Sequence, residues 1–219
     1  MHLGTERDLT LSAAPAADFL TDGTVWDHLR VETSGSPAAP ADQALIGGFR
    51  DAAQEHLDGF TGILGRALIT QTWVMKLARF PCGGSWSLSD LGYRMAAIEV
   101  PLPPLQSITS IVYLDSAGAS QTLSASRYQV VSRGKKPSLI VPAYGEVWPV
   151  TRDQPQAVTV TFVAGYGATA EDVPAPIRAA GLLMVSDLYQ NREAQSAGYE
   201  IKPNPAVDRL IAPYRVLHA

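Results

Sequence analysis

Apolar residues recur at helical spacing in the first third of the chain. After Asp42 they fall three or four positions apart, at Ile46, Phe49, Ala53, Leu57 and Phe60. Polar residues mostly take the other side, at Arg50, Asp51, Gln54 and Glu55. This pattern predicts an amphipathic helix capped by Asp42 and ending near Gly59. A shorter helix is expected before it, capped by Asp22 or Thr24, and the turn-rich residues 33–40 link the two.

A pattern with a period of two begins at residue 67. Apolar and polar residues alternate through residues 67–80, where β-branched and aromatic side chains are enriched, and this predicts a strand. Turn signals at residues 115–118 and at the basic residues 133–136 separate later strand-like runs. These runs are residues 97–100, 108–114, 121–123, 128–131, 139–141 and 158–162. Short strands at this spacing predict an antiparallel sheet.

One long helix is predicted to begin at Pro174 or Pro176, because proline suits the first turn of a helix. Its apolar residues form two stripes, Ile177, Ala180, Met184 and Leu188 in one and Leu182, Val185 and Tyr189 in the other. A helix that is apolar on more than one face is buried on more than one side. We therefore expect a neighbouring subunit to supply part of this burial.

The last part of the chain reads as an extended tail. Pro203, Pro205 and Pro213 exclude a long helix, and only residues 206–211 can form a turn or two. The tail nevertheless carries spaced apolar residues: Tyr199, Ile201, Val207, Leu210, Ile211, Tyr214, Val216 and Leu217. Disordered tails are usually poorer in such residues, so an extended segment that docks on a partner fits better.

Composition narrows the class of protein. The chain has 219 residues, of which 46% are hydrophobic, and a formal net charge of −4. This is enough for one core, and the acidic balance gives no global attraction to DNA phosphates or anionic membranes. The sequence has no apolar run of membrane-spanning length, and residues 1–11 have no apolar core of a signal peptide. Cys82 is the only cysteine, which excludes an intrachain disulfide.

The sequence contains no arrangement typical of catalysis. None of the histidines is spaced for a metal site with Cys82, and no base can be assigned to that thiol. The glycines Gly165 and Gly167 precede a helix but lack the dinucleotide fingerprint and the phosphate-loop lysine, so they are interpreted as a strand-ending turn. We therefore predict a non-enzymatic assembly protein, with no catalytic residue, metal ligand or cofactor.

The order of segments resembles a known family. The matching pieces are Trp26-Asp-His-Leu-Arg-Val31, the helix from Asp42, Arg66-Ala-Leu-Ile-Thr-Gln-Thr-Trp73, Leu102-Pro-Pro-Leu-Gln-Ser-Ile108, Tyr113-Leu-Asp-Ser-Ala-Gly118, Tyr128-Gln-Val130, Val158-Thr-Val-Thr-Phe-Val-Ala-Gly-Tyr-Gly167, Val173-Pro-Ala-Pro-Ile177, Asp187-Leu-Tyr-Gln-Asn-Arg-Glu193 and Asn204-Pro-Ala-Val207. In this order they resemble the head–tail connector, or adaptor, proteins of long-tailed double-stranded DNA phages and of gene transfer agents. Residues 1–10 have no counterpart in that family.

The resemblance implies an α+β fold with a function in assembly. It implies a helical core of N-terminal helices and one long C-terminal helix, with an inserted antiparallel β region and an extended C-terminal tail. The corresponding ranges are 1–65 for the N-terminal arm and helices, 66–167 for the β region, 168–198 for the core helix and 199–219 for the tail. In that family the subunits, usually twelve, form a ring under the portal, continue the DNA channel and carry the stopper or another tail-proximal neck protein.

Candidate residues follow from the stripes, the tail and the resemblance. The portal-binding tail is expected to use Tyr199, Ile201, Pro203, Pro205, Val207, Leu210, Ile211, Pro213 and Tyr214. Packing between subunits is expected to use Ile177, Leu182, Met184, Val185, Leu188 and Tyr189. DNA would cross the lumen without sequence-specific binding, and no membrane is involved. The expected location is the neck of a virion or gene-transfer-agent particle assembled in the bacterial cytoplasm. Another neck, head-closure or tail-completion protein, or a small hydrolase, are the alternatives.

Overall fold

The computed structural model describes residues 7–35, 39–81, 96–191 and 204–216. The chain divides into two compact units, and each is described by itself. The β unit contains residues 1–15 and 70–165, and the helical unit contains residues 16–69 and 166–219. The chain therefore starts in the β unit, passes through the helical unit, and returns to each unit once more.

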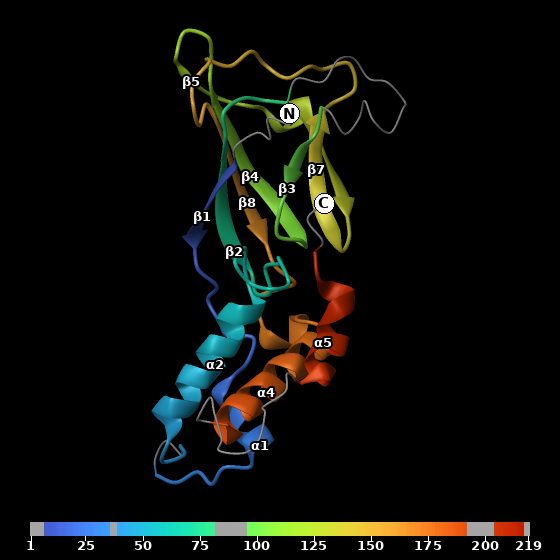
Figure 1. Ribbon diagram of the computed structural model, residues 1–219. Helices are drawn as coiled ribbons and strands as arrows, with labels where there is room; N and C mark the ends of the chain where they lie inside the picture. Colours follow the sequence, from blue (N-terminus) through green and yellow to red (C-terminus); the bar gives the residue numbers. More distant parts are fainter. Residues whose placement is uncertain (1–6, 36–38, 82–95, 192–203, 217–219) are drawn as a thin grey trace. The chain divides into compact units, whose positions relative to one another are not determined.

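An antiparallel sheet of five strands forms one layer of the β unit (Figure 1). Its order is β1-β2-β8-β4-β5, so the first and last strands of this order are the edges. The strands are β1 (Arg7–Ala13), β2 (Gln71–Leu77), β4 (Leu105–Leu114), β5 (Ser120–Thr122) and β8 (Val158–Ala164). β2 lies between β1 and β8, and the chain reaches these neighbours only after long connections.

A second sheet of three strands has the order β3-β7-β6. Its strands are β3 (Ile98–Val100), β6 (Tyr128–Arg133) and β7 (Lys136–Pro142), and the short η1 (Ala125–Arg127) precedes β6. The β6–β7 hairpin turns at Gly134, whose φ of 63° lies in the left-handed region that glycine adopts without strain. The basic turn predicted at residues 133–136 is thus confirmed as a hairpin turn.

Alternation along the strands builds the core of the β unit. Along β2 every second side chain from Gln71 to Leu77 is buried, and β8 shows the same alternation from Val158 to Ala164. Such a period of two turns one face of a sheet toward the core. Trp73, Met75, Phe162, Ile111 and Ile140 are among the buried side chains.

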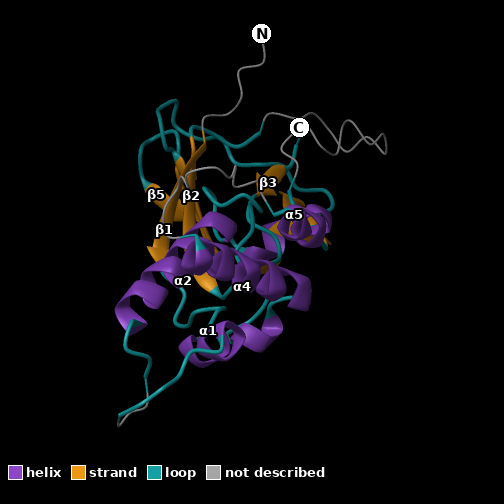
Figure 2. Ribbon diagram, turned by 60° about the horizontal axis from the view of Figure 1, so that its bottom comes forward, coloured by secondary structure: helices purple, strands orange, loops and turns teal. Residues whose placement is uncertain are grey.

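The helical unit gathers its helices around α4 (Figure 2). α4 packs against α2 and α5 and, less extensively, against α1. The helices are α1 (Asp22–Leu29), α2 (Gln43–Leu57), α4 (Ala175–Gln190) and α5 (Pro205–Ile211), with the short η2 (Ala170–Asp172) and η3 (Ala212–Tyr214). Their shared core contains Phe19, Leu20, Val25, Ile46, Leu57, Leu64, Leu68, Val173, Ile177, Val185 and Ile211.

The helix starts differ in detail from the sequence prediction. Thr21, one residue before the predicted cap, accepts a hydrogen bond from the backbone N–H of Thr24 at the start of α1. Asp42 stands at the N-cap of α2 as predicted, but its side chain makes no cap hydrogen bond to the backbone. It accepts one from the hydroxyl of Tyr189 instead, at 2.9 Å.

The structure confirms the α+β class, with its helical core, antiparallel sheets and C-terminal helix. Two elements differ from the expected ranges. Residues 7–13, expected to belong to the N-terminal arm of the helical core, form a strand of the β unit. Residues 206–211, where a turn or two was expected, do form α5, because Asn204 caps the helix and Pro205 fits its first turn. Residues 212–214, expected to be extended, continue it as η3.

Candidate functional site

The two apolar stripes of α4 are covered largely within the chain. Ile177, Ala180 and Val185 are fully buried in the helical unit. Gly181 is buried as well, and a Cβ built there would lie 2.9 Å from Cδ1 of Leu20. The missing side chain thus lets the segment before α1 approach α4 closely.

The remaining stripe residues are only partly covered. Leu182, Met184 and Tyr189 are half-buried and pack against the helical core, and Leu188 is exposed. The chain's own helices therefore explain most of the burial that the sequence assigned in part to a neighbouring subunit. The surface left for a neighbour on α4 is centred on Leu188.

Two hydrogen bonds fix the C-terminal end of α4. The Tyr189 hydroxyl donates to Oδ2 of Asp42, at 2.9 Å, and ties this end to the start of α2. The amide of Asn204 donates to Oδ2 of Asp187 at 3.1 Å, while its own oxygen accepts from the backbone N–H of Ala206. One residue, Asn204, thus both caps α5 and attaches it to α4.

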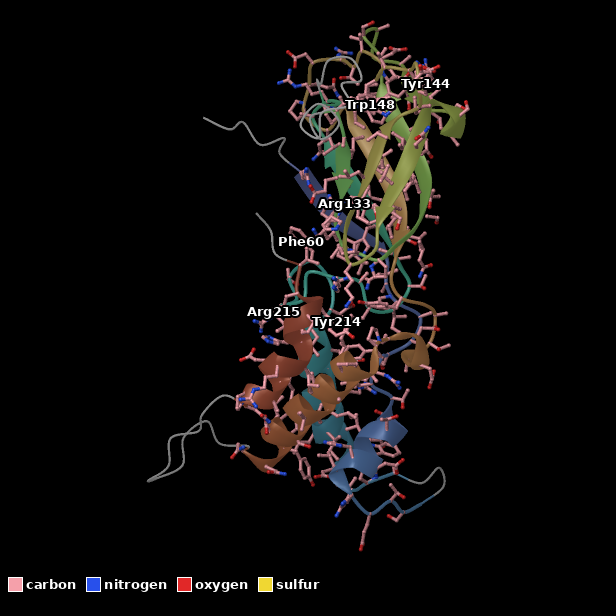
Figure 3. All side chains as sticks on the ribbon, turned by 90° about the vertical axis from the view of Figure 1, so that its right-hand side faces the viewer. Phe60, Arg133, Tyr144, Trp148, Tyr214 and Arg215 are labelled. Carbon is pink, nitrogen blue, oxygen red and sulfur yellow. The ribbon has the colours of Figure 1, made fainter. Side chains whose placement is uncertain are left out.

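Tail residues 204–216 are packed on the rest of the helical unit. Ile211 is 1% exposed, and Val207, Leu210 and Tyr214 pack against the core around it. Arg215 forms a salt bridge with Asp208 at 2.7 Å, across the last turn of the tail. Figure 3 shows Tyr214 and Arg215 at the end of α5.

Arg66 holds the end of this tail. Its side chain is buried, with 2% exposed, and its Nε donates a hydrogen bond to the backbone carbonyl oxygen of Tyr214. The backbone N–H of Val216 donates to the carbonyl oxygen of Leu64 at 2.9 Å. Burial lowers the pKa of Arg66, although the neighbouring phenol of Tyr166 acts in the opposite direction. Burial likewise raises the pKa of Tyr166.

The predicted tail anchors therefore fall into separate groups. Tyr199, Ile201 and Pro203 lie outside the described residues. Val207, Leu210, Ile211 and Tyr214 are at least partly used within the helical unit. Pro205 and Pro213 are exposed on the surface of α5 and η3.

An exposed apolar loop in the β unit was missed by the sequence analysis. Tyr144, Val147 and Val150, between β7 and β8, are 89%, 72% and 79% exposed. The loop is well anchored, because Trp148 stacks on Phe80 with ring centroids 4.8 Å apart. The indole N–H of Trp148 also donates to the carbonyl oxygen of Ala96, at 2.6 Å.

A salt bridge between Arg127 and Glu146, at 2.8 Å, holds the first part of the same loop. Figure 3 places Tyr144 and Trp148 at the same end of the β unit, away from Arg133 at the β6–β7 turn. Large exposed apolar patches mark contact sites, so this loop is a place in the β unit to look for one. Only the run of Tyr, Val, Trp and Val in the sequence hints at this loop, and it equally suits a buried segment.

The described residues provide little for chemistry. Among them, no group of three or more His, Cys, Asp or Glu is placed to bind a metal ion. His28 and His56 are exposed on α1 and α2. Cys82 lies outside the described residues. In the described part of the chain, no helix combines the length and apolar character needed to cross a bilayer.

Comparison with known proteins shows the fold. The chain aligns over 97% of its length, and 97% of the other chain, with a solved structure described as "Neck of empty GTA particle computed with C6 symmetry". The TM-score is 0.72 and the sequence identity is 22%. The chain has the fold of a particle neck protein.

Two further structures agree. A chain of the "Virion of native gene transfer agent (GTA) particle" gives a TM-score of 0.71 at 21% identity, over 96% of both chains. A chain of the "Neck of native GTA particle computed with C12 symmetry" gives 0.70 at 19% identity, over 97% of both chains. No protein-family model and no curated protein matches the sequence. At these identities the likeness concerns the fold, and it extends to both units.

Proposed function

We propose that this protein is a structural subunit of the neck of a phage-like or gene-transfer-agent particle. The observation that carries the proposal is the fold match to chains of such particles, which covers 97% of both chains at a TM-score of 0.72. A match over the full length includes both units and their order along the chain, and is therefore more specific than a match to one common domain. Function still comes from sites rather than from folds, so the proposal needs its own test.

Within the neck, we propose the role of an adaptor ring beneath the portal. Two of the similar neck structures were computed with C6 and C12 symmetry, and this supports a ring of twelve copies. A closed ring uses two different faces of each subunit. Leu182, Met184 and Leu188 still offer apolar surface on α4 for such a contact. The ring would continue the DNA channel and carry a stopper or other tail-proximal protein.

The tail is proposed to grip the portal through its outward side. Because Ile211 is buried and Val207 and Leu210 pack against the core, the docked tail presents Pro205, Arg209 and Pro213 instead. Deleting residues 199–219 would also remove α5, which packs on α4. Loss of portal binding after the deletion could then result either from a destabilised helical unit or from the missing docking residues. Substitution of an exposed tail residue separates the two effects.

The test is co-sedimentation of the full-length protein with the portal protein of its own particle. Arg209→Glu reverses an exposed charge on α5, and we expect it to reduce portal binding at least tenfold with unchanged thermal unfolding. Lys136→Glu, an exposed reversal on the β6–β7 turn, serves as the matched control and should leave binding intact. Absence of portal binding by the unmodified protein would refute the adaptor role and favour another neck or head-closure position.

Electron microscopy of the intact particle provides the test of location. Twelvefold density for this fold at the neck, in contact with the portal, is the expected result. Density elsewhere in the virion, or absence of the chain from purified particles, would overturn the proposal.

A further inference from the structure

The first strand of the β unit is held in an unusual way. β1 pairs antiparallel with β2, with Thr10 opposite Val74 and Leu11 opposite Trp73. All its side chains are exposed except that of Leu9, which is half-buried. The strand thus buries almost nothing on either face, and Figure 1 shows it alone at the margin of the sheet.

Main-chain pairing supplies most of the attachment of β1. One side-chain hydrogen bond reaches β1, from Nε2 of Gln156 to Oδ2 of Asp8, at 3.2 Å. β2 differs, because every second side chain along it is buried in the core. Attachment through backbone hydrogen bonds on a preformed sheet edge is how added strands bind in β-augmentation. The backbone pairing with β2 therefore requires a strand at this edge of the sheet. That strand can come from the same chain or from another copy of it.

The covalent connection of β1 leads away from its sheet. After Pro15 the chain enters the helical unit, and it returns to the β unit only at Thr70. The connector, residues 14–17, consists of three alanines and one proline and is mostly exposed. Asp18 at its end is fixed in the helical unit by the amide of Gln54, at 3.2 Å. Four residues can span about 14 Å when extended.

The helical unit alone offers modest apolar surface for holding a ring together. Its core helix α4 is largely covered by α2 and α5 of the same chain. Among the described residues of this unit, the large apolar side chains that stay exposed are Leu45 on α2, Phe60 and Ile63 in the segment after α2, and Leu188 on α4. A contact made by the β unit would therefore add to the cohesion that α4 can supply in the proposed ring.

We propose that neighbouring subunits of the ring exchange β1, so that residues 7–13 of each copy pair with β2 of the next copy. The inference rests on the ring proposed above. The register would be the one seen here, with Thr10 opposite Val74. Exchange of an identical element keeps the same contacts and adds a link between copies, which makes it a low-cost route to assembly.

The exchange also suits the edge of the sheet. Without β1, the backbone N–H and C=O groups along one side of β2 would be unpaired at the edge of the sheet. Such an open edge invites unwanted pairing with other strands. In a closed ring every copy gives one strand and receives one, so each β2 edge is covered. Separation of two neighbours would then require removal of a seven-residue strand.

The test uses a disulfide across the β1–β2 pair. Thr10→Cys and Val74→Cys are combined with Cys82→Ser in the full-length chain, and the assembled rings or particles are oxidised. Opposite residues of an antiparallel pair have Cα atoms about 4.5–5.5 Å apart, which suits a disulfide. Exchange predicts a ladder of covalent multimers on non-reducing gels, with most of the chain above the monomer.

The matched control keeps the cysteine at position 74 and places the second cysteine on β8, the other neighbour of β2, instead of on β1. Val74 also lies opposite Thr161 of β8. The pair Val74→Cys and Thr161→Cys should therefore give cross-linked monomers only. If the pair of Thr10→Cys and Val74→Cys likewise gives only cross-linked monomers in intact rings, each copy keeps its own β1 and the inference is overturned.

A second measurement covers the case in which the double variant does not assemble. Two full-length chains of different mass, one with Thr10→Cys and the other with Val74→Cys, are mixed and assembled in the background of Cys82→Ser. Exchange predicts a disulfide-linked heterodimer, and its absence from assembled rings overturns the inference. Rings with no link between copies leave the proposed neck function intact, whereas failure of the unmodified protein to form rings at all would count against both.

Discussion

Arg66 donates a hydrogen bond from Nε to the backbone carbonyl oxygen of Tyr214, 148 residues later in the chain. The pair joins the segment after α2 to the end of η3, and the bond from the N–H of Val216 to the carbonyl oxygen of Leu64, at 2.9 Å, lies beside it. Together these bonds fix the tail on the helical unit. The position of the tail thus depends on a buried arginine as well as on apolar packing.

Replacement of Arg66 should loosen the tail. Arg66→Met keeps much of the volume but leaves the carbonyl oxygen of Tyr214 without this donor, which should cost about 1–3 kcal/mol of stability. Urea unfolding measures the cost, and hydrogen exchange of residues 205–216 should accelerate. Arg209→Met, at an exposed position of α5, should change stability by less than about 0.5 kcal/mol. Equal exchange in both variants would contradict the role assigned to Arg66.

The close approach at Gly181 predicts opposite effects for two glycine substitutions. Gly181→Ala places a Cβ 2.9 Å from Cδ1 of Leu20, so overpacking should destabilise the protein by about 1–3 kcal/mol. Gly48→Ala in α2 meets nothing within 4 Å and should stabilise it by about 0.5–1 kcal/mol, because alanine favours helix. Thermal unfolding of both variants gives the signs. A stabilising Gly181→Ala would mean that Leu20 moves aside without cost.

The two half-buried tryptophans should respond differently to phenylalanine. Trp148→Phe keeps an aromatic ring against Phe80 but loses the hydrogen bond to the carbonyl oxygen of Ala96, at a cost of about 1–2 kcal/mol. The buried Nε1 of Trp26 has no hydrogen-bond acceptor among the described residues, so Trp26→Phe removes a donor that is already unpaired. Denaturant midpoints should therefore fall more for Trp148→Phe. The reverse order would contradict the hydrogen bond.

Asp115 predicts a pH-dependent contribution at the β4–β5 turn. A hydrogen bond from Gln121 and further bonds from the backbone N–H groups of Ala119 and Ala117 lower the pKa of this carboxyl. The pKa of this carboxyl is lower in the folded chain than in the unfolded chain. The ionised carboxylate therefore stabilises the fold at pH values above the unfolded pKa, and this contribution is lost as the pH falls through the folded pKa.

The comparison of Asp115→Ala with the unmodified protein measures this contribution. The variant should be less stable at pH 7, and the difference should shrink as the pH is lowered below about 3.8, the ordinary value for an aspartate. Asp153→Ala, at another exposed position of the β unit, serves as the control for the removal of a surface carboxylate. A difference that stays constant from pH 7 to pH 3 would exclude the ionised carboxylate as its cause.

Local patterns in the sequence determined most of the secondary structure. The alternation from Gln71 to Leu77 and from Val158 to Ala164, and the helical spacing of α2 and α4, are signals carried by neighbouring residues. Because a side chain's direction repeats every two residues in a strand and about every 3.6 in a helix, the period identifies the element without its partners.

The limits of sequence appear at the two ends of the chain. Leu9 and Leu11 do alternate with Thr10 and Ser12, as in a strand. Strand formation at β1 nevertheless depends on pairing with β2, which follows only after residues 16–69 of the helical unit. At the other end, the short helix allowed at residues 206–211 is present as α5, but its packing on the helical unit depends on residues distant in sequence.

Only the tertiary structure decided which apolar residues are free for partners. From the sequence, Ile211 was expected to bind the portal and Val185 to pack against a neighbouring subunit, whereas the helical unit buries both side chains. The sequence carried no signal that Tyr144, Val147 and Val150 would be exposed. The reason is physical: hydrophobicity sets the free energy gained on burial, but the surface that covers a side chain comes from residues distant in sequence. The sequence therefore determined the elements and their apolar faces, and the tertiary structure decided which of those faces remain for assembly.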